Sequence, residues 1–417
     1  MSVLLTRGHE AGAAAIRAMI AGTTPHAIVI AGPPGVGKTT LALDLAAGLL
    51  CDAPDAHRRP CRECRGCRLV ERGAHADLDR LSPTGAGNQI RIGDRSEPEP
   101  GTVRRLVSDL ALLPVEGGAR VVIVERADRM NEDAQSALLK TLEEPPAGVT
   151  IVLCADREDQ LLPTVRSRCV RLRLGPVPVR EIEAILADQG VADAPTAARL
   201  ARLSAGRPGI ARAWALAPDA VTARAEIGRS LLDLAAAGPA RRLSIGRELL
   251  LRAADIVGAL DRTSRQPEPA PAGGRARRGG RAGTKGAANR SIPSAADAPA
   301  TQGAADVAPD GDEDEATGSG RDARAPAAER RRAAAVFVEV WRDLTRDLAL
   351  VVHGEERRLR DPGLLDDLRA VTDLSASELG GFLARLDRTM EMIEANVSPE
   401  LAIDVLLLAW PRPRVVA

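Results

Sequence analysis

The stretch that decides the fold is Gly32-Pro-Pro-Gly-Val-Gly-Lys-Thr39, which matches the phosphate-loop pattern G-x-x-x-x-G-K-[ST]. A short apolar run, Ala27–Ile30, precedes it, and a helical pattern from Lys38 to Leu50 follows it. Glycines let successive backbone N–H groups converge on phosphate oxygens, and the helix N-terminus adds a partial positive charge. The sequence therefore predicts a buried strand, a phosphate-binding loop and a helix in that order.

Two side chains of this loop would contact different parts of a bound Mg²⁺–ATP. Lys38 would neutralise the β- and γ-phosphates, and Thr39 would ligate Mg²⁺. Only three residues of the chain are lysine, so a lysine inside the loop favours a position that needs a compact ammonium. The alternative is a loop that keeps its turn and binds nothing. The other residues predicted for the nucleotide site are Gly32, Pro33, Pro34, Gly35, Val36, Gly37, Thr40 and Glu125.

Strand and helix patterns alternate up to residue 175, which is typical of a mainly parallel sheet covered on both faces. From Pro176 onward the pattern is helical. We predict an α/β domain at 1–175, a small helical domain at 176–219 and an all-α domain at 220–417. Beyond the loop, we expect helices at Val103–Leu113 and Glu132–Leu142 and strands at Val121–Val124, Ile151–Cys154 and Cys169–Leu174, the last two buried.

One tract, at about 264–332, differs from the rest in composition. It is rich in Ala, Gly, Pro, Arg and Asp and has almost no large apolar residue. Such a segment cannot bury enough surface to offset its chain entropy. Because helical pattern resumes at Ala333–Val352, we expect a disordered insertion that interrupts the all-α domain.

Charge and hydropathy indicate the environment of the chain. Its 57 basic and 57 acidic residues cancel, which argues against a protein coated by nucleic acid along its whole length. No apolar run approaches the roughly 20 residues that span a bilayer, and the N-terminus lacks a signal-peptide layout. We therefore expect a cytoplasmic protein without a membrane partner.

Cys51, Cys61, Cys64 and Cys67 form the pattern C-x9-C-x2-C-x2-C. Four thiolates at such spacings suit a closed, tetrahedral, structural Zn²⁺ site, and they fit a reducing compartment better than a disulfide framework does. His57 or His75 could replace one thiolate, and a DNA-binding finger or an iron–sulfur cluster is a weaker alternative. Arginines at positions 58, 59, 62, 65 and 68 are expected to lower the thiol pKa values.

Two longer motifs follow in order: Ala137-Leu-Leu-Lys-Thr-Leu-Glu-Glu-Pro-Pro146 and Leu162-Pro-Thr-Val-Arg-Ser-Arg-Cys169. Together with the phosphate loop and the cysteine motif, they resemble the clamp-loader branch of the AAA+ family over residues 10–215. The resemblance implies an AAA+ domain, a helical lid and a helical collar. It also implies partners: gamma/tau and delta subunits in a hetero-oligomeric ring that opens a sliding clamp and loads it on primed DNA.

Two departures separate this chain from the motor subunits of that family. Motor subunits read D-E-x-D after the strand at Val121–Val124, where this chain has Glu125 at the Mg²⁺ position and Arg126 at the catalytic Glu position. A guanidinium cannot act as a base near neutral pH. In addition, Gly209 replaces a nucleotide-sensing Arg, and the side chain of Arg207 would need a different path. The resemblance thus implies a stator-type subunit that binds ATP and hydrolyses it poorly.

The resemblance further implies that Arg168 is an arginine finger that reaches the γ-phosphate of ATP in a neighbouring subunit. The alternative is an arginine that pairs with a local carboxylate.

Two rival functions are a gamma/tau-like active ATPase and a zinc-dependent DNA-binding regulator. We find no carboxylate pair that suggests two-metal nucleotidyl transfer. Polymerase activity would therefore belong to the holoenzyme.

Overall fold

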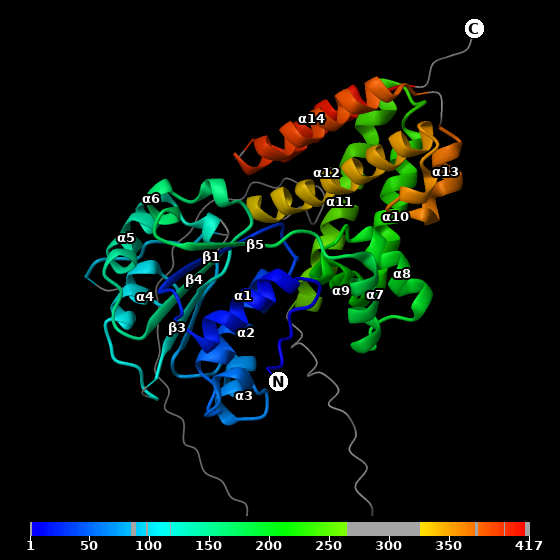
Figure 1. Cartoon of the computed structure of the whole chain (residues 1–417). Coiled ribbons are helices and arrows are strands. Elements are labelled where there is room, and N and C mark those ends of the chain that lie inside the picture. Colours follow the sequence, from blue (N-terminus) through cyan, green and yellow to red (C-terminus); the bar gives the residue numbers. More distant parts are fainter. Residues whose placement is uncertain are drawn as a thin grey trace, which may run out of the picture. The chain divides into compact units, whose positions relative to one another are not determined.

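A five-stranded parallel sheet forms the framework of residues 27–173 in the computed structural model, with strand order β2-β3-β4-β1-β5 (Figure 1). The structure describes residues 2–84, 89–96, 99–116, 118–264, 326–371, 374–395 and 397–412. Within these ranges none of the helices combines the length and the hydropathy that a membrane crossing requires. The strands are β1 Ala27–Ala31, β2 Leu78–Leu81, β3 Arg120–Val124, β4 Val149–Ala155 and β5 Val170–Arg173.

Helices cover both faces of the sheet because alternate residues of each strand point to opposite sides. Ile28 and Ile30 pack in one hydrophobic cluster with α1 and α2, whereas Ala27 and Val29 pack in another with α4 and α5. Figure 1 shows the two helix pairs on opposite sides of the strands. The helices of this domain are α1 Glu10–Ala21, α2 Lys38–Leu49, α3 Arg65–Glu71, α4 Val103–Leu110, α5 Glu132–Glu143 and α6 Pro163–Arg166.

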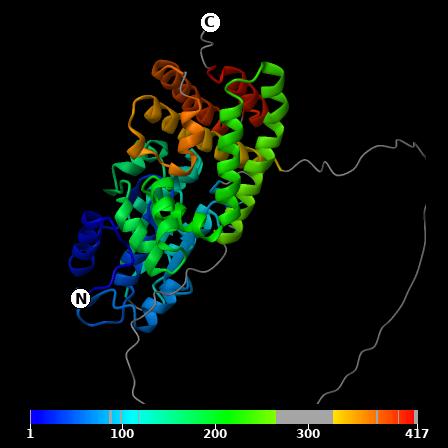
Figure 2. The ribbon, with the colours of Figure 1, turned by 90° about the vertical axis from the view of Figure 1, so that its right-hand side faces the viewer.

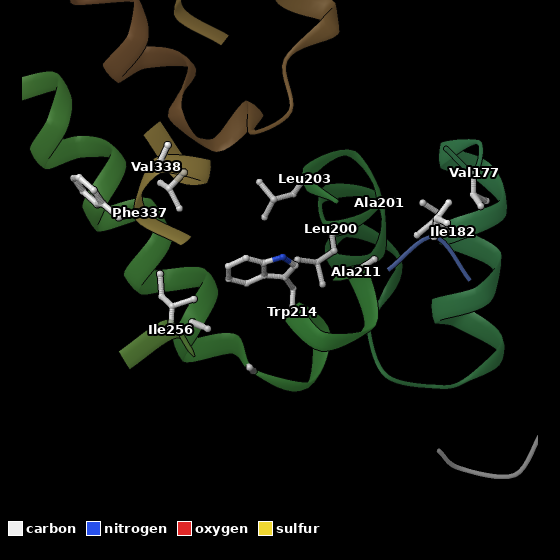
Figure 3. Close-up of a cluster of buried hydrophobic side chains, with 14 of the residues drawn as sticks. Val177, Ile182, Leu200, Ala201, Leu203, Ala211, Trp214, Ile256, Phe337 and Val338 are labelled. Carbon is white, nitrogen blue, oxygen red and sulfur yellow. The ribbon is translucent and has the colours of Figure 1, made fainter. Parts of the chain in front are cut away.

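The rest of the described chain is helical. The indole of Trp214, on α9, lies between Leu200 of α8 and residues of α11 and α12, among them Ile256 and Phe337 (Figure 3). The C-terminal helix α15 packs on α11, and Figure 2 shows this red helix beside the green ones. The helices are α7 Val179–Asp188, α8 Ala194–Leu203, α9 Pro208–Leu216, α10 Pro218–Asp233, α11 Pro239–Ser264, α12 Ala327–Val352, α13 Leu365–Arg369, α14 Ala376–Glu394 and α15 Pro399–Ala409.

The predicted fold class, a parallel α/β domain followed by an all-helical region, is confirmed. The sequence-based assignment missed β2 and α3, and it extended the helix at Val103 beyond its actual end at Leu110. The borders at 175 and 219 stay predictions.

Two further expectations need correction. The strand β5 is a largely exposed edge strand, so the prediction of a buried strand was wrong there, and the half-buried Cys169 precedes it. The helix α12 begins at Ala327, so the last residues of the tract at 264–332 are helical. Residues 265–325, on which the expectation of disorder falls, lie outside the described residues.

A buried group of ion pairs joins α8, α10 and α12. Arg224, on α10, donates to Asp343 Oδ2 at 2.9 Å and lies 3.7 Å from Asp361 Oδ2. Asp361 also accepts from Arg199 of α8 at 3.2 Å. Burial lowers the pKa of Arg224, and the carboxylate of Asp361 opposes that effect. A charge removed from this group therefore leaves its partners buried and poorly compensated.

Replacing Arg224 by Ala should destabilise the chain by about 3–5 kcal/mol, because two buried carboxylates lose a partner. The matched control is Arg229→Ala on the same helix, since Arg229 pairs at 3.3 Å with Asp367 at the exposed surface. That change should cost less than about 1 kcal/mol. Urea unfolding followed by circular dichroism measures both, and equal midpoint shifts for the two variants would contradict this account.

Candidate nucleotide-binding site and cysteine cluster

The phosphate loop connects β1 to α2 as predicted, and its backbone conformation favours glycine at several positions, two of them in its second half. Gly35 has φ 77° and Gly37 has φ 111°, in the left-handed region that residues with a Cβ rarely adopt. A Cβ on Gly35 would also lie 2.8 Å from Cγ1 of Ile210, on helix α9. The loop is therefore shaped both by its own turn and by the helix that rests on it.

Lys38 is buried, and its ammonium contacts three oxygens of the chain itself. Nζ donates to the carbonyl oxygens of Gly32 and Pro33 at 2.8 Å each and lies 2.7 Å from Oδ1 of Asp156. An ammonium has three donors, so all three are used in this conformation. Among the other predicted residues, Pro33 and Pro34 are exposed, Val36 is buried, and Thr39 and Thr40 are half-buried in the first turn of α2.

Two more segments rest on the loop. The backbone N–H of Gly209, at the start of α9, donates to the carbonyl of Gly35 at 2.9 Å. The imidazole Nε2 of His9 lies 2.8 Å from the carbonyl oxygen of Val36. His9 immediately precedes the first helix, and no pattern in the sequence marked it as part of this site.

The second acidic motif lies at the same edge of the sheet, because parallel strands end on the same side. Glu125 follows β3 and forms an ion pair with Arg80 of β2, whose Nε donates to Oε1 at 3.0 Å. Arg126 has φ 51°, and its Nε lies 3.5 Å from Oδ2 of Asp156. The carboxylate of Asp156 is thus placed between the ammonium of Lys38 and the guanidinium of Arg126.

Sequence reasoning missed both Arg80 and Asp156. The register pairs Leu81 with Val124, which brings Arg80 next to the end of β3, but β2 itself had not been predicted. Asp156 follows β4 directly, and its backbone N–H donates to Oδ1 of Asp128 at 2.8 Å. Burial raises the pKa of Asp128 above its ordinary value.

The two arginines named from the sequence do not contact this loop. Arg207 Nη1 lies 2.5 Å from Oε1 of Glu339 on α12, and its Nε donates to the carbonyl of Ser204. Arg207 therefore does not substitute for a side chain at position 209. Arg168 Nη2 lies 2.6 Å from Oε1 of Glu143, the last residue of α5, and its Nη1 donates to the carbonyl of Thr164.

The four cysteines predicted as metal ligands gather in one place. Their sulfurs lie within 4.8 Å of one another, and Cys51 Sγ is 3.6 Å from Cys61 Sγ and 3.8 Å from Cys64 Sγ. Thiolates on a tetrahedral zinc, at about 2.3 Å from the metal, stand about 3.8 Å apart, so the donor set and its size fit Zn²⁺. Neither His57 nor His75 joins the group. His75 is buried elsewhere and accepts from the backbone N–H of Asp77.

The flanking arginines do not lower the thiol pKa values in the way we expected. Burial raises the pKa of both Cys51 and Cys67. Burial also acts to raise the pKa of Cys61, but hydrogen bonds from the backbone of Glu63 and Cys64 outweigh it and bring the value to about 7. The guanidinium of Arg62 pairs with the buried Asp44 of α2. It therefore ties the cysteine loop to the helix that follows the phosphate loop.

Fold and site together define a class of protein: a parallel α/β domain with a P-loop between its first strand and the following helix, continued by an all-helical region. Within this class, residues 10–178 match the family described as DNA polymerase III, delta subunit. The curated relatives that the chain resembles include delta' subunits of DNA polymerase III.

Known relatives agree with this placement. The chain is 40% identical over 146 residues to DNA polymerase III subunit delta' of Pseudomonas aeruginosa, covering 35% of this chain and 42% of that one. It is 36% identical over 193 residues to the Escherichia coli delta' subunit, covering 46% and 55%. It is also 32% identical over 183 residues to the tau subunit of Salmonella typhimurium, covering 43% and 27%.

Similarity to these relatives is partial in length. The chain spans about half the length of the curated delta' relatives named above. Among solved structures, a gamma-subunit-related protein of Thermotoga maritima aligns over 96% of this chain and 99% of its own, with 16% identity and a TM-score of 0.40.

Replacing Cys64 by Ser should abolish zinc binding, because a structural zinc site needs all four of its ligands. Metal content of the purified chain, measured by inductively coupled plasma mass spectrometry, checks this. The control is Cys169→Ser, which removes a half-buried thiol outside the cluster and should leave the zinc content unchanged. A Cys64→Ser variant that retained a full complement of zinc would contradict the assignment.

Proposed function

We propose that the chain is a delta-prime-type subunit of the DNA polymerase III clamp loader that binds ATP, hydrolyses it poorly and acts as a stator. The observation that carries the proposal is Arg126. It stands where a motor subunit has its catalytic carboxylate, and it pairs with Asp156 at 3.5 Å. A guanidinium that is charged at every relevant pH cannot take a proton from water.

We propose that the chain acts on ATP chemistry through Arg168, in the site of a neighbouring subunit. Arg168 is about one-third exposed, and its partner Glu143 is about half exposed. An exposed ion pair of this kind contributes little stability, so exchanging Glu143 for a phosphate costs little. A guanidinium also matches phosphate oxygens in geometry and charge.

The partners that this function requires are gamma/tau and delta subunits, and the chain would reach the sliding clamp and primed DNA through the assembled ring.

One exposed surface, on the C-terminal helix α15, supports assembly with other subunits. Leu401, Val405 and Leu408 are spaced by four and three residues on α15, and between about half and two-thirds of each is exposed. An apolar stripe on a helix that is otherwise packed in the bundle favours a protein interface.

A gamma/tau-like motor is the second candidate, because the chain is 32% identical to a tau subunit and keeps Lys38 and Thr39. The two candidates differ in one measurable property. The isolated stator should bind ATP with negligible turnover, whereas a motor should hydrolyse it. Lys38→Ala, which should lose ATP binding, is the control for both measurements.

In a loader reconstituted with gamma/tau and delta subunits, Arg168→Ala should lose the turnover of the one motor site that Arg168 faces. An arginine finger is worth about 10³–10⁵ in rate at its site. Steady-state ATPase with clamp and primed DNA measures the effect. The matched control is Arg171→Ala, an exposed arginine of β5 that pairs with Glu158 at 3.3 Å. Unchanged ATPase in the Arg168→Ala loader would reject the finger.

Charged residues on the α15 stripe should block assembly. The double substitution Leu401→Glu and Val405→Glu should leave the isolated chain folded, since both side chains are exposed, and prevent its co-elution with the other subunits in size-exclusion chromatography. The control pair Leu401→Met and Val405→Ile keeps the stripe apolar and should assemble. Normal assembly of the charged variant would exclude α15 from the interface.

A further inference from the structure

We propose that the phosphate loop binds a nucleoside polyphosphate free of divalent cation, and that the guanidinium of Arg80 takes the place of the magnesium ion. The inference rests on the proposed binding of nucleotide at Lys38 and specifies the ionic form of the ligand. The inference is based on the carboxylates of Glu125, Asp128 and Asp156 at this edge of the sheet, whose contacts do not fit a magnesium site.

The carboxylate in the magnesium position already has a cationic partner. Both Nε and Nη2 of Arg80 contact Oε1 of Glu125. The side chain of Glu125 is only 21% exposed, so the pair is partly sheltered from water. Mg²⁺ needs near-ideal octahedral oxygen ligation and gives up its waters reluctantly. To reach Glu125 it would have to displace a guanidinium that cannot lose its charge.

The carboxylates of Asp156 and Asp128 also have partners within the chain. Asp156 bridges Lys38 and Arg126, at 2.7 and 3.5 Å. Asp128 is turned toward the backbone N–H of Asp156, and burial raises its pKa. A metal ion could therefore reach Asp156 or Asp128 only by displacing a contact that each already makes within the chain.

The cations, in contrast, are arranged for an anion. The strand register brings Leu81 next to Val124, Val124 next to Leu153, and Ile30 next to Cys154, so the ends of four strands lie side by side. Cys154, on β4, lies at this edge, where burial raises the pKa of its thiol and the nearby ammonium of Lys38 opposes that effect. Arg80 pairs with the residue that follows β3 and Lys38 with the residue that follows β4, and these two strands are neighbours in the sheet.

Arg126 completes the arrangement. Its Nε is buried and donates no hydrogen bond to the described residues, although it lies 3.5 Å from Asp156. When a phosphate oxygen replaces Asp156 on Lys38, Asp156 keeps Arg126 as a partner and is not left as an uncompensated charge. Lys38 and Arg80 are then the cationic side chains that face a polyphosphate that carries no metal, while Arg126 balances Asp156.

Isothermal titration calorimetry of the full chain with ATP, in excess MgCl₂ and in EDTA at equal ionic strength, tests the proposal. The two dissociation constants of the wild type should agree within about threefold, because Mg²⁺ gains no carboxylate ligand. Arg80→Ala should weaken binding in EDTA about tenfold or more and restore a preference for Mg²⁺, since it removes a charged donor and releases Glu125. Arg105→Ala, an exposed arginine of α4 that pairs with Asp109 at 2.9 Å, is the control and should change neither constant.

Three outcomes would overturn the inference. Binding of ATP to the wild type about tenfold or more tighter in Mg²⁺ would show that the metal has a site after all. Unchanged binding in EDTA by Arg80→Ala would show that Arg80 does not contribute. Absence of binding in both buffers would refute the proposed nucleotide binding itself, and that result differs from a metal preference.

Discussion

The parallel direction of the sheet is the constraint on which the rest of this structure depends. Strands β1, β3 and β4 end at one edge, so the segments that follow them are neighbours although they are far apart in sequence. The phosphate loop, Glu125 and Asp156 meet there for that reason alone. Lys38 is thereby placed against Asp156, and this contact contributes to the charge balance of the candidate site.

That charge balance gives a physical reason for the binding without turnover that we propose. In an active ATPase, one carboxylate holds the metal and another polarises the attacking water. Here each carboxylate of the site is paired with a cation or turned to a backbone amide, and the position of the second is occupied by Arg126. A guanidinium stabilises negative charge but does not generate a nucleophile. Such a site is suited to holding a nucleotide as part of the fold.

How well each strand could be predicted depended on whether its apolar residues are continuous in the sequence. Strands β1, β3 and β4 are continuous apolar runs and were predicted to within two residues at each end. Strand β2 was missed because Asp79 and Arg80 interrupt its apolar residues. Its parallel pairing with β3 holds it in the sheet, and Asp79 also accepts a hydrogen bond from Arg120.

The same distinction applies to the candidate site. Lys38, Glu125 and the four cysteines belong to motifs with fixed spacing, so the sequence was sufficient to name them. Arg80 and Asp156 take part only because neighbouring strands are in a particular register, and register is set by tertiary packing. The choice between cysteine and histidine as the fourth ligand likewise required distances between side chains.

The start of α9 carries Gly209 at the position where the family resemblance places a sensing arginine. Gly209 has no side chain to reach a phosphate, but its backbone N–H binds the carbonyl of Gly35, and a Cβ at position 209 would lie only 3.1 Å from that oxygen. Two residues earlier, Arg207 is directed to Glu339 on α12. The first turn of α9 is therefore held by the phosphate loop on one side and by the long helix α12 on the other. A movement of the loop must shift α9 or break the Gly209 hydrogen bond, so α9 links the phosphate loop to the C-terminal helices through backbone and ion-pair contacts.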